Sequence, residues 1–189
     1  VLFGEAMGSH IAEMYFGENA RYATRDISVL ANHLVDGYSI VDWTFMRTPY
    51  PVVWAVRNDG VLLSLTYLPD RSASNQGILA WTQHTTDGFF ESVTVIPEST
   101  GEEKLYAVIK RTINGAAKRF VERMKSRRID DIKDSFFVDC GLTYNGSAAS
   151  TITGLDHLEG RTVAVVADGI HHPNQVVNNG QISLQAPAS

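Results

Sequence analysis

The chain has 189 residues, of which 44% are hydrophobic and 20% are charged, and its net charge is −5. This composition is that of an ordinary globular protein and excludes a disordered chain. No apolar run approaches the roughly 18 to 20 residues that a transmembrane helix needs, so we expect no membrane span. Cys140 is the single cysteine, which excludes an intrachain disulfide and is typical of a protein made in a reducing compartment.

The charge is unevenly distributed along the chain. Residues 1–128 carry 14 basic and 14 acidic side chains, whereas residues 129–189 carry 2 basic and 7 acidic ones. A short charged segment, 127–134, lies between the two parts. We therefore predict two domains, 1–128 and 129–189. The apolar start at Val1 and the extended end at 186–189 favour an internal fragment of a longer polypeptide.

One short helix is predicted near residues 25–35. Its apolar side chains recur with helical spacing at Ile27, Leu30, Ala31 and Leu34. Capping oxygens precede this run in 24–26, and Gly37 follows it. The preceding residues, 1–23, contain three glycines that would interrupt a helix, so we expect strand-like or irregular structure there.

Residues 39–125 show the period of strands, interrupted by turn signals every 8 to 15 residues. Two hairpins repeat the same plan, with Gly60 and Gly115 at their tips, 55 residues apart. This interval is close to the length of a β-propeller blade. A third hairpin is predicted to join 78–84 to 89–96 through Asp87-Gly88. The residues 69–77 read as a polar loop.

Beyond residue 134 the pattern indicates a small module of short strands. Strands are predicted at 135–144, 162–167, 173–177 and 181–184, separated by turns rich in asparagine, aspartate and glycine. The predicted fold class is therefore mainly β. It combines antiparallel strands of a partial β-propeller, a small C-terminal β-barrel-like domain and the one short helix.

A basic stretch runs along the second hairpin and the residues after it. It includes Arg127 and Arg128, and the candidate residues for facing nucleic acid or another partner are Lys110, Arg111, Lys118, Arg119, Arg123 and Lys125. Clustered basic side chains are the electrostatic footprint of a surface that binds nucleic acid. The alternative is a solvated hairpin face whose lysines and arginines discourage aggregation.

The aromatic side chains of the predicted strands allow two interpretations. Trp43, Trp54 and Trp81 each lie in a predicted strand, and Phe89-Phe90 begins another. Exposed rings would supply a platform on which sugars or bases stack. The alternation of these rings with polar residues favours core filling between packed sheets.

The residues offer little catalytic chemistry. His84, Asp87 and Ser92 are the residue types of a hydrolytic triad, but no nucleophile-elbow glycine pattern accompanies them. His171 and His172 are adjacent, so in a strand they point to opposite sides and do not form a metal site. We predict no catalytic residue, no metal and no cofactor, and we interpret Cys140 as a small hydrophobic residue of an apolar strand.

Several strings together resemble a known group of proteins. They are Met14 to Tyr22, Asp26 to Ala31, Ile40 to Trp43, Val53 to Tyr67, Trp81 to Gly88 and Gly154 to Val163. These strings are similar to tail structural proteins of tailed phages and prophages, in particular the tail nozzle, or tail tubular, proteins of short-tailed phages, which are built around a β-propeller. The final module also resembles a small β-domain of ubiquitin-activating enzymes, a likeness of shape that carries no activity.

The resemblance implies a non-enzymatic component of the virion tail, made in the cytoplasm of a bacterial host. It implies a homo-oligomer, hexameric in nozzles, that contacts other tail proteins and through which genomic DNA passes. Two alternatives stay open. One is a glycan-binding receptor module of a phage tail that uses the tryptophans or Phe89-Phe90, and the other is a hydrolase that uses His84, Asp87 and a nearby serine.

Overall fold

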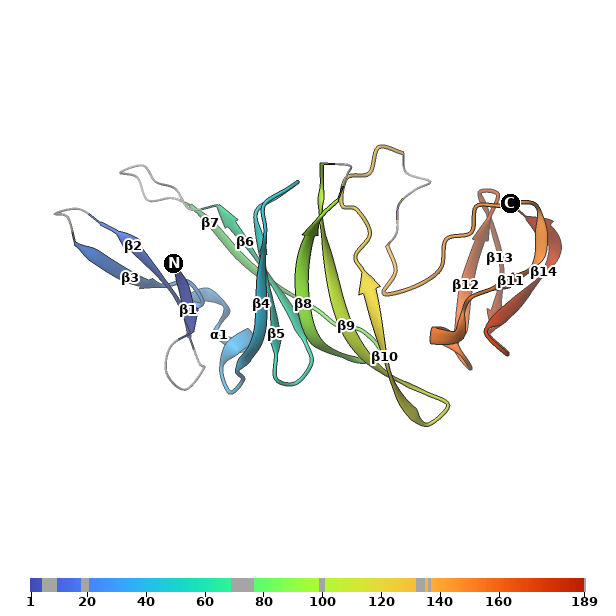
Figure 1. Ribbon diagram of the computed structural model, residues 1–189, viewed down its shortest axis with the longest axis horizontal. Coiled ribbons are helices and arrows are strands. Elements are labelled where there is room, and N and C mark those ends of the chain that lie inside the picture. The colour runs from blue at the N-terminus through green and yellow to red at the C-terminus, as the bar shows by residue number, and fades with distance from the viewer. Residues whose placement is uncertain are drawn as a thin grey trace. The chain divides into compact units, whose positions relative to one another are not determined.

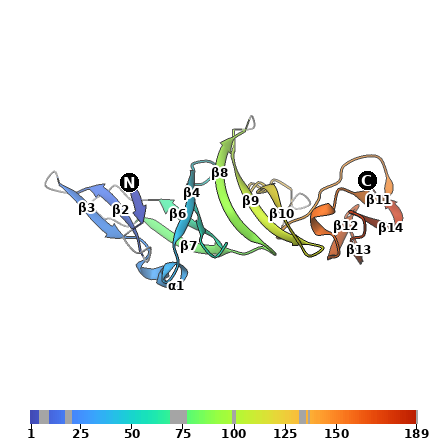
Figure 2. The ribbon, with the colours of Figure 1, turned by 60° about the horizontal axis from the view of Figure 1, so that its bottom comes forward.

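The computed structural model describes residues 1–4, 10–17, 21–68, 77–98, 101–131, 135 and 137–188. The chain forms two compact units (Figures 1 and 2). The first consists of Val1–Ile109 and Val121–Arg127, and the second of Lys110–Phe120 and Arg128–Ser189. Antiparallel strands dominate both units, which confirms the mainly β prediction.

The first unit begins with a three-stranded antiparallel sheet, where strand-like or irregular structure was expected. Its strands follow one another in chain order: β1 (Leu2–Gly4), β2 (Ile11–Phe16) and β3 (Tyr22–Asp26). Glu13 of β2 is buried, and its carboxylate accepts hydrogen bonds from Arg25 Nε at 2.8 Å and from the Tyr67 hydroxyl. The buried charge is thus paired, as burial requires.

The predicted helix is present but short. A 3-10 turn, η2 (Val29–Ala31), leads into α1 (Asn32–Val35). Ala31 and Leu34 face the core as predicted, whereas Leu30 is 93% exposed and the prediction that it lies on the buried face was wrong. The tighter winding of the 3-10 turn accounts for this difference, because it rotates the side chains away from the 3.6-residue pattern.

A four-stranded antiparallel meander is the centre of the first unit (Figure 1). Its strands are β4 (Ile40–Met46), β5 (Val52–Arg57), β6 (Leu62–Leu68) and β7 (Ile78–His84). Every residue of β5 is buried, so both faces of the sheet are covered there. The predicted loop 69–77 between β6 and β7 lies outside the described residues, apart from Gly77.

The two faces of this sheet belong to two different cores. Val53, Ala55 and Leu65 pack on one side against Ile11 and the short helix, including Leu34. The other core contains Met46, Val52, Trp54, Val56, Leu62, Val93, Leu105, Ala107 and Ile109. Alternation along β5 explains the division, because successive side chains of a strand point to opposite faces.

A second meander follows, with the strand order β10-β9-β8. Its strands are β8 (Phe89–Pro97), β9 (Glu103–Ile113) and β10 (Ala116–Arg123). The predicted hairpin through Asp87-Gly88 was wrong, because β7 pairs with β6 while β8 pairs with β9. The start of β8 lies instead beside the tip of the first hairpin, where Phe90 N–H donates to the Gly60 carbonyl at 3.0 Å.

The two glycine hairpins are confirmed and occupy corresponding places in their meanders. Gly60 follows β5 and Gly115 follows β9, so each lies between the second and third strand of its sheet. Asn114 and Gly115 have φ of 50° and 74°, which is typical of a two-residue hairpin turn. Gly60 has φ of 83° in a longer turn closed by the bond from Arg57 N–H to the Val61 carbonyl.

The second unit contains two two-stranded sheets, β11 with β14 and β12 with β13. The strands are β11 (Ala149–Thr153), β12 (Thr162–Ala167), β13 (Ile170–Val176) and β14 (Gln181–Ala188), and a 3-10 turn, η4 (Asp156–Leu158), follows β11. The core comprises Leu155, Val177, Ile182, Leu184 and Ala188. The predicted strand at 135–144 was wrong, because the described part of this segment is irregular.

The described strands form five open sheets, and none closes into a barrel or a propeller within the described ranges. The three strands predicted last, around residues 162–167, 173–177 and 181–184, are confirmed as β12, β13 and β14. Asp168 and Gly169 join β12 to β13 with φ of 50° and 77°, again a two-residue hairpin turn.

Candidate functional site

The predicted basic residues do not behave as one exposed patch. Lys118, Arg119 and Lys125 are exposed, and Lys110 is half-buried. Arg111 is only 3% exposed, on the same side of β9 as buried Ile109 and Ile113. Arg111 therefore does not contribute to a solvent-facing patch, because strand alternation turns it inward.

Arg123 has a local partner. Its guanidinium lies 3.1 Å from the Glu98 carboxylate, which also accepts a hydrogen bond of 2.7 Å from the Tyr106 hydroxyl. The hydrogen bond from Tyr106 and the nearby guanidinium lower the pKa of Glu98. Arg123 thus links β10 to the end of β8.

The histidine of the predicted triad is paired with a different serine. His84 Nε2 lies 2.9 Å from Ser64 Oγ, because Ser64 of β6 and His84 of β7 point to the same face of the sheet. Burial, followed by the charge of Arg127, lowers the pKa of His84. A carboxylate that oriented the ring would act in the opposite direction. Ser64 is only 8% exposed, between packed sheets, where a substrate would not reach a nucleophile.

The same face of the sheet carries an aromatic and cationic cluster. The Trp54 ring is 5.3 Å from the His84 ring, and the Arg127 guanidinium carbon is 5.8 Å from the Trp54 ring. The Tyr50 ring is a second aromatic neighbour of Arg127, with 5.4 Å between the Arg127 Cζ atom and the ring centroid. We call Tyr50, Trp54, Ser64, His84 and Arg127 the Trp54 cluster.

One local signal in the sequence points to this cluster. Ser64 interrupts the otherwise apolar run Leu62-Leu63-Ser64-Leu65, and a polar residue in a buried strand calls for a partner. The partner itself depends on the register between β6 and β7, in which Leu62 is opposite His84 and Ser64 is opposite Thr82. Arg127 follows β10, and no sequence pattern predicts that it lies beside Trp54.

The three tryptophans have three different environments. Trp54 is 1% exposed, and Trp81 is half-buried with its indole N–H donating to the Ile27 carbonyl at 2.8 Å. Trp43 is 38% exposed, and Phe45, two residues further along β4, is 43% exposed. Core filling accounts for Trp54 and Trp81, while Trp43 and Phe45 stay available to solvent.

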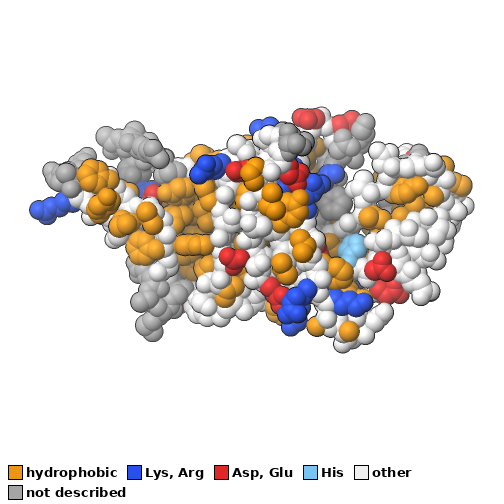
Figure 3. Space-filling view, viewed as in Figure 1, with side chains coloured by type: hydrophobic (Ala, Val, Ile, Leu, Met, Phe, Trp, Pro, Cys, Tyr) orange, Lys and Arg blue, Asp and Glu red, His pale blue; other side chains and the backbone are white. Residues whose placement is uncertain are grey.

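Hydrophobic side chains gather over β2, β3 and β4 in the space-filling view (Figure 3). The exposed large hydrophobic residues of these strands are Phe16, Tyr22, Val41, Trp43 and Phe45. Phe16 and Tyr22 pack edge to face, with their ring centroids 5.5 Å apart. An apolar surface of this kind marks an interaction site more often than a dispersed set of single residues does.

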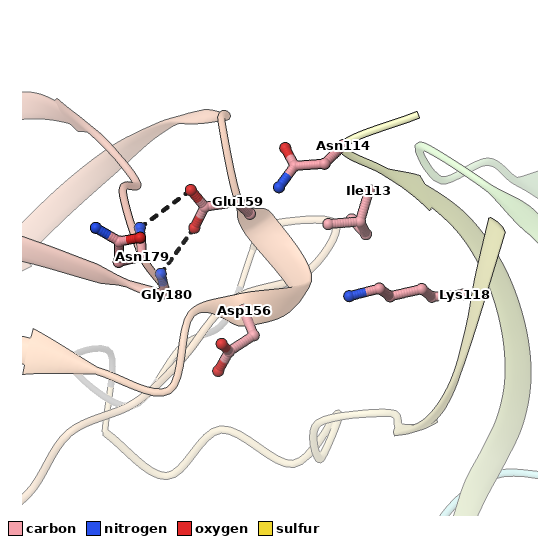
Figure 4. A pocket seen from close by; sticks show the side chains of 7 residues that line it. All are labelled: Ile113, Asn114, Lys118, Asp156, Glu159, Asn179 and Gly180. Carbon is pink, nitrogen blue, oxygen red and sulfur yellow. Dashed lines mark hydrogen bonds between the residues drawn. The ribbon is translucent and has the colours of Figure 1, made fainter. Parts of the chain in front are cut away.

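A pocket of about 220 Å³ lies within the second unit (Figure 4). The Lys118 side chain points toward the turn that carries Asp156 and Glu159. Glu159 accepts hydrogen bonds from the backbone N–H groups of Asn179 at 3.0 Å and Gly180 at 2.7 Å. Both oxygens of the Glu159 carboxylate therefore bind the turn between β13 and β14, so the role of Glu159 is structural.

The described residues contain no cluster of three or more histidine, cysteine, aspartate or glutamate side chains arranged to hold a metal ion. His171 and His172 lie in β13 and differ in exposure, as adjacent strand residues do. Cys140 is half-buried in irregular chain, so its predicted place in a strand was wrong. Among the residues that the structure describes, no helix has the length and apolar character that crossing a membrane requires.

Comparison with known proteins adds no assignment to this geometry. No protein-family model matches the sequence, and no curated protein is significantly similar to it.

Proposed function

We propose that this chain is a structural β-module of a phage or prophage tail protein that assembles as a ring. The observation that carries the proposal is the succession of two antiparallel meanders, β4–β7 and β8–β10, with Gly60 and Gly115 between the second and third strands. A propeller blade is a four-stranded antiparallel meander, as β4–β7 is, and a propeller repeats such sheets around an axis. The strings that resemble tail nozzle proteins support the same interpretation.

The described sheets are too few to close a propeller. A propeller needs at least four blades to close, and the described residues supply one four-stranded meander, β4–β7, and two three-stranded ones, β1–β3 and β8–β10. Closure therefore requires further blades. In the proposed assembly the module contacts other copies and other tail proteins, genomic DNA passes through the lumen, and the chain performs no catalysis.

The experiment is electron microscopy of the full-length protein that contains this sequence, purified alone and from virions. We expect ring-shaped particles and, in virions, labelling at the tail by an antibody against residues 137–188. A fixed molar mass above that of the monomer in light scattering supports the ring. A protein that stays monomeric at micromolar concentration and is missing from tails would refute the proposal.

Glycan binding is the second candidate, and the exposure of Trp43 and Phe45 favours it. Sugars stack on exposed aromatic rings, and these two rings lie on one face of β4, where alternate residues point the same way. A glycan array with Trp43→Ala and Phe45→Ala tests this candidate. Phe137→Ala, which removes an exposed ring in the second unit, is the matched control. Identical array signals for all three variants and the parent would exclude it.

A further inference from the structure

Arg127 is held in place by two aromatic rings. Its guanidinium carbon lies 5.4 Å from the centroid of Tyr50 and 5.8 Å from that of Trp54. Both distances are within the roughly 6 Å over which a guanidinium is attracted to the face of an aromatic ring, and this attraction favours the observed position of the side chain. Among the described residues, the hydrogen-bond partner of this guanidinium is Met46 Sδ at 3.9 Å, and a thioether is a weak acceptor.

An acidic neighbour of Arg127, Glu102, is engaged by other groups. No carboxylate of the described residues forms an ion pair with it. Burial lowers the pKa of Arg127, and the groups that oppose this effect are Tyr50 and Glu102. Glu102 itself binds Lys104 Nζ and accepts a hydrogen bond of 2.9 Å from Ser126 Oγ. Arg127 is therefore partly desolvated, and no oxygen atom of the described residues accepts a hydrogen bond from it.

Two polar rings lie beside the Arg127 guanidinium, those of Trp54 and His84. The Trp54 indole N–H is buried and has no hydrogen-bond acceptor among the described residues. The His84 ring lies 5.3 Å from the Trp54 ring, and its Nε2 is hydrogen-bonded to Ser64 Oγ. Trp54 is buried and His84 is bonded to Ser64, so an incoming ligand reaches the exposed Arg127 guanidinium, a cationic donor that favours a ligand with oxygen atoms.

We propose that Arg127, on its platform of Tyr50 and Trp54, is a binding site for a phosphate-type oxyanion. The planar fork of a guanidinium matches two oxygen atoms of a phosphate group and binds them through two parallel N–H donors. Arg127 and Tyr50 are both exposed, so an anion reaches them from solvent while the core stays closed. Trp54 is buried and acts as a positioning residue beneath the guanidinium.

The ligand is defined here by its chemistry, which a free phosphate and a phosphodiester of a nucleic acid share. The two sources differ in affinity and salt dependence, because a nucleic acid also releases counterions from several phosphates. The site does not depend on the proposed tail function. A protein that forms rings but does not bind phosphate would support the tail function alone, and a monomer that binds phosphate would support the anion site alone.

Titration of the 15N-labelled chain with inorganic phosphate, and separately with a short DNA duplex, tests the site. We expect saturable shifts of the Trp54 indole and Arg127 signals, identified by Trp54→Phe and by Arg127→Lys. Arg127→Gln is expected to weaken phosphate binding about tenfold or more, because it removes a charge-assisted bidentate contact. Arg128→Gln removes the same charge one residue further on and is the matched control.

A duplex that binds more tightly than phosphate and competes with it identifies a phosphodiester as the ligand, whereas binding of phosphate alone identifies a small anion. Arg127→Lys keeps the charge and the long stem, so it preserves the fold and is expected to bind phosphate more weakly than the parent chain. Equal losses in the Arg127→Gln and Arg128→Gln variants, or the absence of saturable shifts in the parent, would overturn the proposal.

Discussion

Asp42 of β4 and Val93 of β8 are joined by a hydrogen bond in which Asp42 Oδ2 accepts from the Val93 backbone N–H at 2.9 Å. β4 and β8 are edge strands of two different sheets. A side chain thus satisfies a backbone donor at a sheet edge, where a neighbouring strand would otherwise pair. The bond fixes the two meanders beside one another and leaves them as separate sheets.

Removal of this acceptor is expected to loosen β8. Asp42→Ala should lower the free energy of unfolding by about 1 to 3 kcal/mol, the cost of an unsatisfied buried donor. Asp42→Asn keeps an acceptor oxygen and should cost less. Urea denaturation measures both values, and hydrogen exchange of the Val93 amide should accelerate in Asp42→Ala. Unchanged exchange of that amide would show that the bond does not protect β8.

Gly60 and Gly115 should differ sharply in their tolerance of alanine. Both have positive φ, at 83° and 74°, which costs a non-glycine residue about 1 kcal/mol. A Cβ on Gly60 would lie 2.4 Å from Phe89 Cδ1, whereas a Cβ on Gly115 would meet nothing within 4 Å. We expect Gly60→Ala to lower the unfolding free energy by at least about 1 kcal/mol more than Gly115→Ala.

The double variant Gly60→Ala/Phe89→Ala separates strain from contact. Because Phe89→Ala removes the ring atoms that the new methyl group would meet, the second alanine should cost less in this background than in the parent chain. Thermal unfolding of the four proteins gives the coupling. Additive losses would mean that Phe89 moves aside without cost, and the two glycines would then be equivalent in energy as well as in position.

Turn chemistry explains why much of the fold could be predicted from the sequence. Asn114-Gly115 and Asp168-Gly169 are local signals, since each pair adopts the positive φ values that a two-residue hairpin needs. Asp87-Gly88 resembles them but connects two different sheets. A turn signal shows where the chain reverses, whereas strand pairing depends on distant groups such as Asp42 and the Gly60 carbonyl.

The candidate site was harder to predict for the same reason. The triad hypothesis used residues close in sequence, His84 and Ser92, while the structure pairs His84 with Ser64 across the β6–β7 ladder. Burial of Arg111 follows from strand alternation, which the charge pattern alone did not reveal. The position of Arg127 on Trp54 is tertiary, and nothing in the spacing of these residues indicates it.

Asp59 should contribute to acid stability. The Asp59 carboxylate accepts a hydrogen bond of 2.9 Å from Arg57 Nε, and this bond is the main cause that lowers the pKa of Asp59. Arg57 also donates to the Leu34 carbonyl at 2.7 Å, so the pair anchors the helix to the hairpin. A group whose folded pKa is lowered stabilises the fold above its unfolded pKa, and this contribution is lost as the pH falls through the folded value.

We therefore expect Asp59→Asn to be less stable than the parent chain at pH 7, with the difference shrinking below about pH 4, the ordinary pKa range of aspartate. Denaturant unfolding at pH 7, 5 and 3 measures this difference. Asp36→Asn removes an exposed carboxylate after α1 and is the matched control. A difference between Asp59→Asn and the parent that stays constant with pH would contradict the assignment.

His84 should also lose its contribution to stability on acidification, but in a pH range closer to neutrality. Burial and the charge of Arg127 lower the pKa of His84, so the folded protein keeps the ring neutral at a pH where the unfolded chain has begun to bind a proton. The contribution to stability is complete above the unfolded pKa of about 6.5 and falls as the pH drops toward the lower folded value.

His84→Gln removes this titration, and His33→Gln removes an exposed histidine of α1 as the control. Between pH 7 and 5 the parent and His33→Gln should lose stability more steeply than His84→Gln. Parallel curves for all three proteins would mean that His84 takes up its proton equally easily in the folded and unfolded chains, and that Arg127 does not act on it.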